Sequence, residues 1–160
     1  MTTAAEEAAR PAVTDDFGQI VALAAELRAG MAEQRGGPLW ESHDALAPVT
    51  VADLAARTSN PTLATLVGTL DGFVLAYGLA RLEPIARGNG TLGVIDELFV
   101  AEPARAVGVG EVLLAALVSW CRDAHCIGID ATALPGDRQA KNFFESAGFK
   151  ARRLIMHTDL

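Results

Sequence analysis

The first part of the chain has the apolar spacing of helices. Apolar side chains recur every three or four residues over residues 17–34, which predicts an amphipathic helix. A second, short helix is expected over residues 51–57, with Thr50 as its N-terminal cap. Residues 1–10 show no such period and are expected to form a loose tail. The folded domain is therefore predicted to span residues 11–160.

The middle of the chain has the pattern of antiparallel strands. Two strand-like runs, 62–70 and 73–83, flank the pair Asp71 and Gly72, which favours the two-residue turn of a β-hairpin. A third run, 91–102, follows a Gly-Asn-Gly turn and is interrupted by two adjacent acids. Strands that follow one another through short turns are expected to pair antiparallel.

Beyond Pro103 the period becomes that of a helix. One continuous apolar stripe is formed by Val109, Val112, Leu113, Ala116, Leu117, Trp120 and Cys121. A short buried strand is then expected over residues 126–134, a helix over 137–148 and a last strand over 149–160. A strand, a helix and a strand in this order imply one parallel pair within a mainly antiparallel sheet. The predicted class is α+β, in one layered domain.

Composition excludes some functions. The 160 residues carry a net charge of -7, which argues against nonspecific binding to nucleic acid, since that needs a basic surface. Although 51% of the residues are hydrophobic, no apolar run approaches the ~20 residues that span a bilayer. The two cysteines, Cys121 and Cys126, have neither a disulfide nor a metal-ligand pattern. We expect a reduced, cytoplasmic protein without a metal, a membrane or a nucleic-acid partner.

The stretch RAVGVGEVLL, residues 105–114, places two glycines at the expected start of a helix. The first amides of a helix lack internal acceptors and carry a partial positive charge, so they attract anions. No Ser, Thr, Asp or Asn stands just ahead of Gly108 to cap this helix, which leaves room for an external anion. The pattern matches neither a P-loop nor a dinucleotide fingerprint. On the alternative interpretation, the glycines only allow tight strand-to-helix packing.

The segment ELFVAEPARAVGVGEVLL resembles the acetyl-CoA-binding segment of the GNAT superfamily of N-acetyltransferases, with Arg105, Gly108 and Gly110 at the signature positions. A second segment, DRQAKNFFESAGF, resembles the family's later motif, in which an alanine precedes an aromatic pair and a Gly-Phe closes the helix. The residues that match the later motif are Ala140, Phe143, Phe144, Gly148 and Phe149. Two motifs in the right order are more specific than either one. The resemblance implies a GNAT-like α+β domain.

The resemblance also implies a cofactor site for acetyl-CoA. The amides of residues 106–111 would hold the pyrophosphate, and the backbone of residues 98–100 would pair with the pantetheine arm like an added strand. The full expected set is Leu98, Phe99, Val100, Arg105, Ala106, Val107, Gly108, Val109, Gly110, Glu111, Asp137 and Phe144. Two positions depart from the family: Asp137 stands where relatives commonly have asparagine, and Phe144 where a tyrosine usually protonates the leaving thiolate.

Acetyl transfer to an amine needs a base, because an amine with a pKa near ~10.4 is protonated at neutral pH. Asp96 and Glu97 are the candidates, and strand alternation is expected to point them to opposite faces. In related spermidine/spermine acetyltransferases, the position nine residues before the signature arginine faces the substrate, and here that position is Asp96. Glu97 remains the alternative base, turned inward by packing or by a bulge. Both acids could instead be solvated or paired with Arg81 or Arg87.

The resulting hypothesis is an acetyl-CoA-dependent N-acetyltransferase that acts by direct transfer to a primary amine in a ternary complex. The expected acceptor is a small-molecule or peptide amine, and a homodimer is one option for the assembly. Because Phe144 has no proton to give, the alternative is a noncatalytic acyl-CoA-binding or sensing module. Tyr77, the only tyrosine, is expected to serve packing, and Trp40 to anchor the segment after the first helix.

Overall fold

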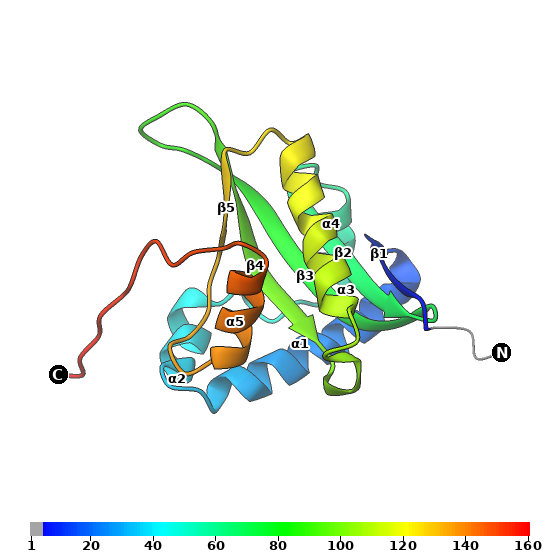
Figure 1. Cartoon of the computed structure of the whole chain (residues 1–160), viewed down its shortest axis with the longest axis horizontal. Coiled ribbons are helices and arrows are strands. Elements are labelled where there is room, and N and C mark those ends of the chain that lie inside the picture. The colour runs from blue at the N-terminus through cyan, green and yellow to red at the C-terminus, as the bar shows by residue number, and fades with distance from the viewer. Residues whose placement is uncertain (1–4) are drawn as a thin grey trace.

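The structure, a computed structural model, describes residues 5–160 and is built on one five-stranded sheet (Figure 1). Its strands are β1 (Glu7–Pro11), β2 (Leu63–Leu70), β3 (Phe73–Pro84), β4 (Thr91–Val100) and β5 (Gly128–Ala131), which lie side by side in that order. Neighbours from β1 to β4 pair antiparallel, and β4 pairs parallel with β5. The predicted α+β class, with one parallel pair in a mainly antiparallel sheet, is confirmed.

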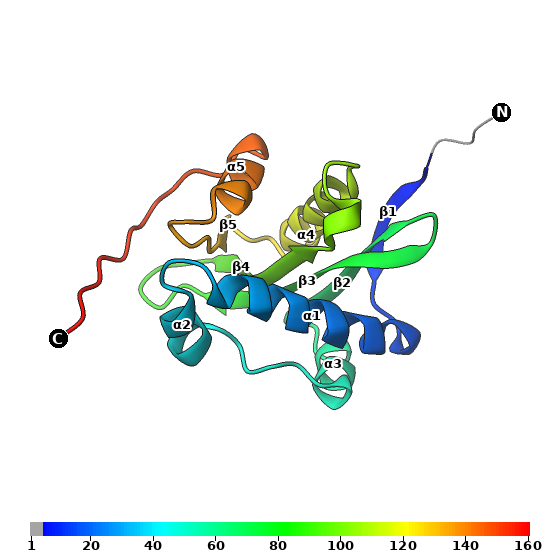
Figure 2. The same ribbon diagram turned by 90° about the horizontal axis from the view of Figure 1, so that it is seen from below.

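Helices cover both faces of the sheet. They are α1 (Phe17–Ala32), α2 (Gly37–Leu39), α3 (Val51–Thr58), α4 (Val109–Asp123) and α5 (Arg138–Ser146), with short helical turns at Thr14–Asp16, Trp40–Asp44 and Glu102–Ala104. Figure 2 shows α1 and α3 on one face and α4 and α5 on the other. Within residues 5–160, none of the helices has the length and apolar character needed to cross a membrane.

Alternation along β3 divides the core into two layers. Tyr77 and Leu79 pack with Ile20 and Leu54 on the face covered by α1 and α3. Residues of opposite parity, such as Ala80, pack against the apolar stripe of α4 on the other face. Val109, Leu113 and Leu117 of the predicted stripe are buried there, whereas Val112 is only half-buried and the buried Leu114 was not predicted. Side chains of β3 contribute to both layers.

The predicted hairpin turn and helix caps are present in the structure. Asp71 and Gly72 both have positive φ, 49° and 83°, as a type I′ hairpin turn requires. The hydroxyl of Thr50 accepts a hydrogen bond from the Asp53 amide and caps α3. The side chain of Asp137 accepts one from the Ala140 amide, 3.0 Å away, and caps α5. These predictions are confirmed.

The expectation of a loose tail over residues 1–10 is wrong for Glu7 to Arg10, which belong to β1 and pair with β2. Arg10 forms an ion pair with Asp16, with Nη1 2.6 Å from Oδ2, and so ties this strand to the turn that leads into α1. This largely exposed edge strand consists of small and charged residues and a proline, so no hydrophobic pattern reveals it. Residues 1–4 of the predicted tail lie outside the described residues.

The predicted last strand over residues 149–160 is also wrong, because this segment has no regular secondary structure. It follows α5 and leaves the body of the molecule (Figures 1 and 2). The strand expected over residues 126–134 is shorter than predicted, and β5 is half-buried instead of buried, since it forms an edge of the sheet. A sequence pattern shows strand propensity but not which edge is available for pairing.

Candidate active site

The loop before α4 leaves several backbone amides without acceptors in the helix. Ala106 and Gly108 have positive φ, 64° and 91°, and such alternation turns successive N–H groups into a concave, anion-binding arrangement. Gly108 is the N-cap and supplies no side-chain acceptor. The first hydrogen bond of α4 runs from the Val112 amide to the Gly108 carbonyl, 3.1 Å, so the amides of residues 109–111 have no acceptor within the helix.

The two glycines of this loop serve different purposes. Gly108 is required for its left-handed backbone, which side chains rarely tolerate. A Cβ on Gly110 would lie 3.2 Å from the side chains of both Phe143 and Val100. The packing interpretation therefore holds for Gly110, which lets α4, β4 and α5 meet closely.

Arg105 fixes the end of β4. Its Nε donates a hydrogen bond to the Val100 carbonyl at 2.9 Å, and its guanidinium lies 5.6 Å from the centre of the Phe99 ring. The signature arginine thus acts on the protein itself, where it holds the strand end and the loop in one geometry.

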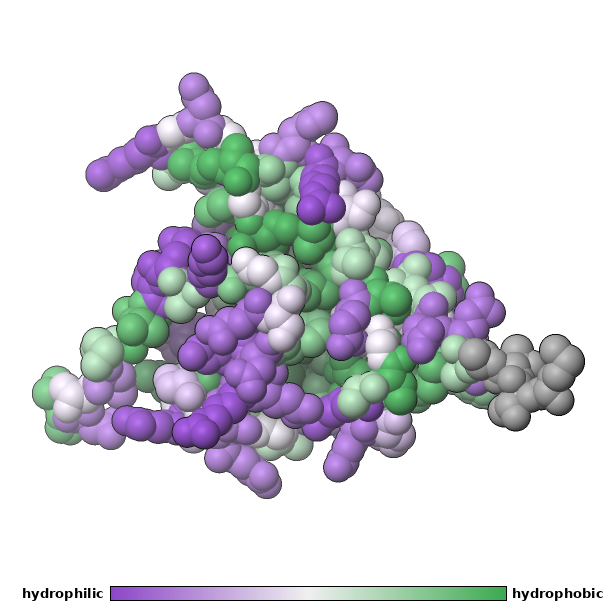
Figure 3. All heavy atoms as spheres, in the orientation of Figure 1, coloured by the Kyte–Doolittle hydropathy of each residue, from purple (hydrophilic) through white to green (hydrophobic). Residues whose placement is uncertain are grey.

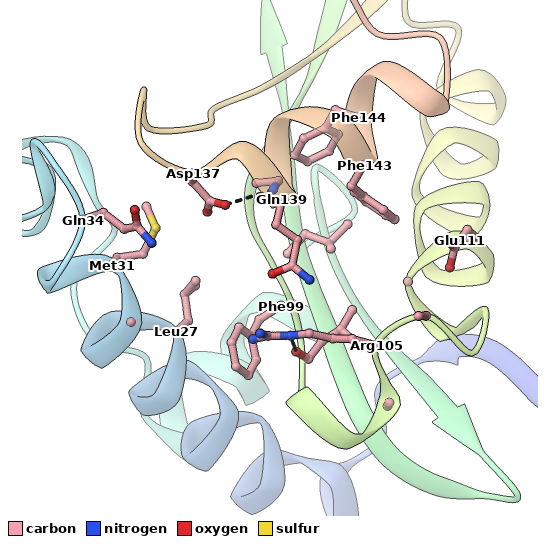
Figure 4. A pocket seen from close by; sticks show the side chains of 17 residues that line it. Leu27, Met31, Gln34, Phe99, Arg105, Glu111, Asp137, Gln139, Phe143 and Phe144 are labelled. Atoms are coloured by element: carbon pink, nitrogen blue, oxygen red, sulfur yellow. Dashed lines mark hydrogen bonds between the residues drawn. The ribbon is translucent and has the colours of Figure 1, made fainter.

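A pocket of about 290 Å³ opens between the end of β4, this loop, α5 and α1 (Figure 4). Nine of the twelve predicted cofactor residues line it: Leu98, Phe99, Val100, Arg105, Ala106, Gly110, Glu111, Asp137 and Phe144. The other three, Val107, Gly108 and Val109, do not line this pocket. Val109 is fully buried in the core, and the side chain of Val107 is exposed.

The opposite wall of the pocket comes from α1 and was not predicted. Leu27 and Met31 project from α1, and Gln34 from the turn just after it, across from α5 (Figure 4). No spacing rule connects these residues with a motif about 70 positions later. Their place follows only from the packing of α1 across the sheet.

One edge of β4 is free beside the pocket. The ladder between β4 and β5 covers only Leu92 to Ile95, whereas residues 98–100 continue to pair with β3 on the other side. Alternate amides and carbonyls of a strand paired on one side point to its open edge. An extended ligand can therefore add to β4 at this place.

A β-bulge interrupts β4 at the acidic pair. Leu79 pairs with Glu97 and Ala80 with Ile95, so Asp96 is an extra residue without a partner position on β3. Asp96 forms an ion pair with Arg81, which shares the face of Leu79 by alternation. The expectation that the two acids point to opposite faces is wrong, because the bulge brings both to the side of α1 and α3.

Glu97 is enclosed by partners from distant parts of the chain. Its side chain is only 2% exposed, and its Oε2 accepts a hydrogen bond from the Tyr77 hydroxyl at 2.7 Å. The guanidinium of Arg28 lies 3.7 Å from Oε1. Burial raises the pKa of Glu97, while the Tyr77 hydrogen bond and the charges of Arg28 and Arg57 act in the opposite direction.

Asp96 has a different environment. Its side chain is 8% exposed and one oxygen meets Arg81, as the ion-pair alternative predicted, with Arg81 and not Arg87 as the partner. Its second oxygen, Oδ2, is buried and has no hydrogen-bond partner among the described residues. A buried carboxylate oxygen without a donor is costly. Neither Asp96 nor Glu97 is among the residues that line the pocket.

Several residues around the acids were not identified from the sequence. Tyr77 is packed as expected, but its hydroxyl also binds Glu97, and Arg28 stacks 5.9 Å from the ring centre of the buried Trp40. Arg57 reaches from α3 and donates to the carbonyls of Ala64 and Ala80. The lone tyrosine within the apolar run of residues 73–80 was one available signal.

The aromatic motif of α5 closes the pocket without supplying a proton donor. Phe144 packs against Phe143 and Phe149, with ring centres 5.4 and 5.3 Å apart. It lines the pocket at the position where the resemblance places a tyrosine. Asp137 lines the pocket as well, with one oxygen engaged in capping α5.

Comparisons with known proteins show the family and the fold of the chain. The sequence model of the acetyltransferase (GNAT) family matches residues 32–149, and the chain belongs to this family. A comparison with curated protein sequences gives no match.

Solved structures share the fold at low sequence identity. A mutant of protein BH1408 from Bacillus halodurans is 20% identical with a TM-score of 0.81, over 95% of this chain and 98% of that one. Glucosamine-6-phosphate N-acetyltransferase from Arabidopsis thaliana is 17% identical with a TM-score of 0.69, over 96% and 98%. The aminoglycoside N-acetyltransferase AAC(6')-Iy in complex with CoA is 16% identical with a TM-score of 0.71, over 95% and 98%.

Proposed function

We propose that this protein is an acetyl-CoA-dependent N-acetyltransferase that moves an acetyl group directly to a primary amine in a ternary complex. The observation that carries the proposal is continuity along one strand. The free edge of β4 lies in the wall of the pocket, and the bulge with the buried, unpartnered oxygen of Asp96 comes directly before it on the same strand.

The residues of the pocket fit acetyl-CoA. The amides at the start of α4 suit the pyrophosphate, because they combine open donors with the positive end of the helix dipole. The open edge of β4 at residues 98–100 suits the pantetheine arm, which carries amide groups of its own. Bound acetyl-CoA would supply the activated thioester. Family membership and the CoA complex of the similar aminoglycoside N-acetyltransferase support this assignment.

Asp96 is the proposed proton acceptor. The amine must lose a proton as its nitrogen bonds to the acetyl carbon and the carbon–sulfur bond breaks. The free Oδ2 of Asp96 can accept that proton, while Arg81 holds the other oxygen in place. Glu97 is retained as the alternative base, since burial raises its pKa and so strengthens it as a proton acceptor. Phe144 has no hydroxyl, so in this scheme the departing thiolate takes its proton from water.

The test is a panel of amines assayed with acetyl-CoA, with released thiol as the readout. The panel should contain amino sugars, polyamines, amino acids and peptides with free N-termini, because two of the similar structures are amino-sugar or aminoglycoside acetyltransferases. Transfer to at least one amine, with strong loss in Asp96→Asn, is the expected result. Transfer at an unchanged rate in both Asp96→Asn and Glu97→Gln would contradict the assigned chemistry.

A second function is favoured by one observation, the phenylalanine at position 144. Binding of acetyl-CoA without transfer to any member of the panel would support a noncatalytic acyl-CoA-binding or sensing module. Introducing the missing hydroxyl with Phe144→Tyr separates the two. A catalytic site that lacks only an acid should gain turnover, whereas a sensing module should not.

A further inference from the structure

The end of α4 brings the two cysteines of the chain together. The helix ends in a Schellman motif, in which the Cys126 amide donates a hydrogen bond to the Cys121 carbonyl at 3.0 Å. The His125 amide donates the second hydrogen bond of the motif, to the Arg122 carbonyl at 2.9 Å. The side chains of the first and last residues of this motif commonly touch each other. Here both of these residues are cysteines, and both are free thiols.

The hydrogen bond between Cys126 and Cys121 limits the separation of their α carbons. An amide nitrogen lies ~1.5 Å from its own α carbon and a carbonyl oxygen ~2.4 Å from its own, so the two α carbons are at most ~7 Å apart. Disulfides join α carbons that are usually ~4.4–6.8 Å apart. A bond between the two sulfurs therefore needs no more than a small adjustment of the backbone.

The two thiols have different environments. Cys121 is only 1% exposed, and a Cβ on Gly93 of β4 would collide with its sulfur, so this glycine makes room for the thiol inside the strand. Burial raises the pKa of the Cys121 thiol to about 12, and the neighbouring Cys126 thiol raises it as well. Cys126 is partly exposed. An oxidant from the solvent therefore meets Cys126 first, with Cys121 directly behind it.

A groove gives small molecules access to both cysteines. It has a volume of about 470 Å³ and lies between α4, β5 and the residues that follow α5, with Cys121 and Cys126 in its lining. The groove is on the side of the sheet that carries α4 and α5. In the view of Figure 3, which faces that side, hydrophobic residues in green are visible between hydrophilic ones in purple. A molecule as small as hydrogen peroxide can enter such a groove.

We propose that Cys121 and Cys126 form a reversible disulfide when the protein meets a peroxide. The Cys126 thiolate attacks one peroxide oxygen, the O–O bond breaks, and a sulfenic acid and hydroxide are formed. The Cys121 sulfur then attacks the sulfenic sulfur, the S–O bond breaks, and the hydroxyl leaves as water with the Cys121 proton. In sum, two thiols and hydrogen peroxide give one disulfide and two waters. The sulfurs are oxidised and the peroxide oxygens are reduced.

The disulfide would clamp the end of α4. His125 has a positive φ of 56° at the position of the motif that glycine usually occupies, so the motif carries backbone strain. A covalent bond between its first and last residues would hold this geometry. The spacing of five positions between the cysteines is no disulfide pattern by itself, and the helix end supplies the missing proximity. This inference depends on the fold alone and stands or falls separately from the acetyl-transfer proposal.

The test treats the folded, reduced wild type with hydrogen peroxide in small steps. Thiols are counted after denaturation, and the intact mass is measured without reductant. Both thiols should disappear together, the mass of the monomer should fall by two hydrogens, and dithiothreitol should restore both thiols. The chain has only two cysteines, so a monomer with this mass contains the proposed disulfide. A gain of oxygen atoms instead, or a disulfide-linked dimer as the main product, would overturn the proposal.

Two matched variants test the order of the steps. In Cys121→Ala, Cys126 should still react but should stop at the sulfenic acid, which dimedone traps. In Cys126→Ala, the buried Cys121 should react at least about tenfold more slowly than the thiols of the wild type. Circular dichroism checks that both variants are folded. Equal reaction rates of the two single-cysteine variants would contradict the assigned roles of the exposed and the buried thiol.

Discussion

The two ends of the site are built in different ways. The wall assigned to acetyl-CoA consists of backbone and apolar groups: the amides before and in the first turn of α4, the open edge of β4, and phenylalanines from α5. The acidic end consists of side-chain charges, with Asp96 and Glu97 held by Arg81, Arg28 and Tyr77. A backbone site tolerates changes of side chain, whereas a charged cluster depends on the identity of each member. Substitutions should therefore have unequal effects at the two ends.

The largest effect is expected at Asp96. Asp96→Asn keeps the size of the side chain and removes the base, so turnover should fall by about 10²- to 10⁴-fold while acetyl-CoA affinity changes little. Steady-state kinetics and a binding titration measure the two quantities separately. A fall in affinity that matches the fall in turnover would place Asp96 in the cofactor site and remove the contrast between the two ends.

The next effect is expected in the loop before α4. Val107→Pro deletes one amide that we propose to face the pyrophosphate, and a hydrogen bond to a charged group contributes ~1.5–3 kcal/mol, or a loss of about 10- to 100-fold in affinity. Val107→Ala keeps the amide and should bind acetyl-CoA nearly as well as the wild type, as an exposed side chain suggests. Calorimetric titration of both variants gives the comparison. Equal weakening by alanine and proline would show that the side chain, not the backbone, matters.

At the acidic end, titration of Glu97 should make the stability of the protein depend on pH. The folded-state pKa of Glu97 is raised above its usual 4.5, so its contribution is fully present below the unfolded pKa and is lost as pH rises through the folded value. Relative to Glu97→Gln, the wild type should therefore become less stable as pH rises from about 4.5. Tyr77→Phe removes a hydrogen bond that lowers this pKa, so it should extend the loss to higher pH. Denaturant unfolding at several pH values measures the difference, and a difference independent of pH would contradict the assigned burial effect.

The smallest effect is expected at Asp137. Asp137→Ala removes the cap of α5 and should cost ~1 kcal/mol of stability, while Asp137→Asn keeps an acceptor and should cost less. Chemical denaturation measures both variants. A large loss of acetyl-CoA affinity in the asparagine variant would show a direct cofactor contact that capping does not explain.

The parts of the fold that sequence reasoning predicted correctly depend on local signals. The turn at Asp71 and Gly72, the stripe of α4 and the cap at Asp137 each need only a few neighbouring residues. The strand β1 and the segment after Gly148 were predicted wrongly, because strand formation depends on an available edge far away in the sequence. The same residues can be a strand or an extended tail, and only pairing decides between them.

For the site, too, local signals could be predicted and contacts between distant residues could not. Nine of the residues that line the pocket could be named from the sequence, because the two motifs fall at the end of β4, in the loop before α4 and in α5. Its α1 wall could not, since Leu27 and Met31 reach the pocket through tertiary packing. Strand alternation could not predict the orientation of Asp96 and Glu97 either, because a bulge adds one residue to β4 relative to β3.

The central claim is that the end of β4 and the start of α4 form an acetyl-CoA site. It is tested most directly by thermal or chemical unfolding of the wild type with and without acetyl-CoA. Ligand at about 100 times its dissociation constant should stabilise the folded protein by ~2.7 kcal/mol, and Val107→Pro should need more ligand for the same gain. Absence of any stabilisation by acetyl-CoA or coenzyme A across a wide concentration range would contradict the account.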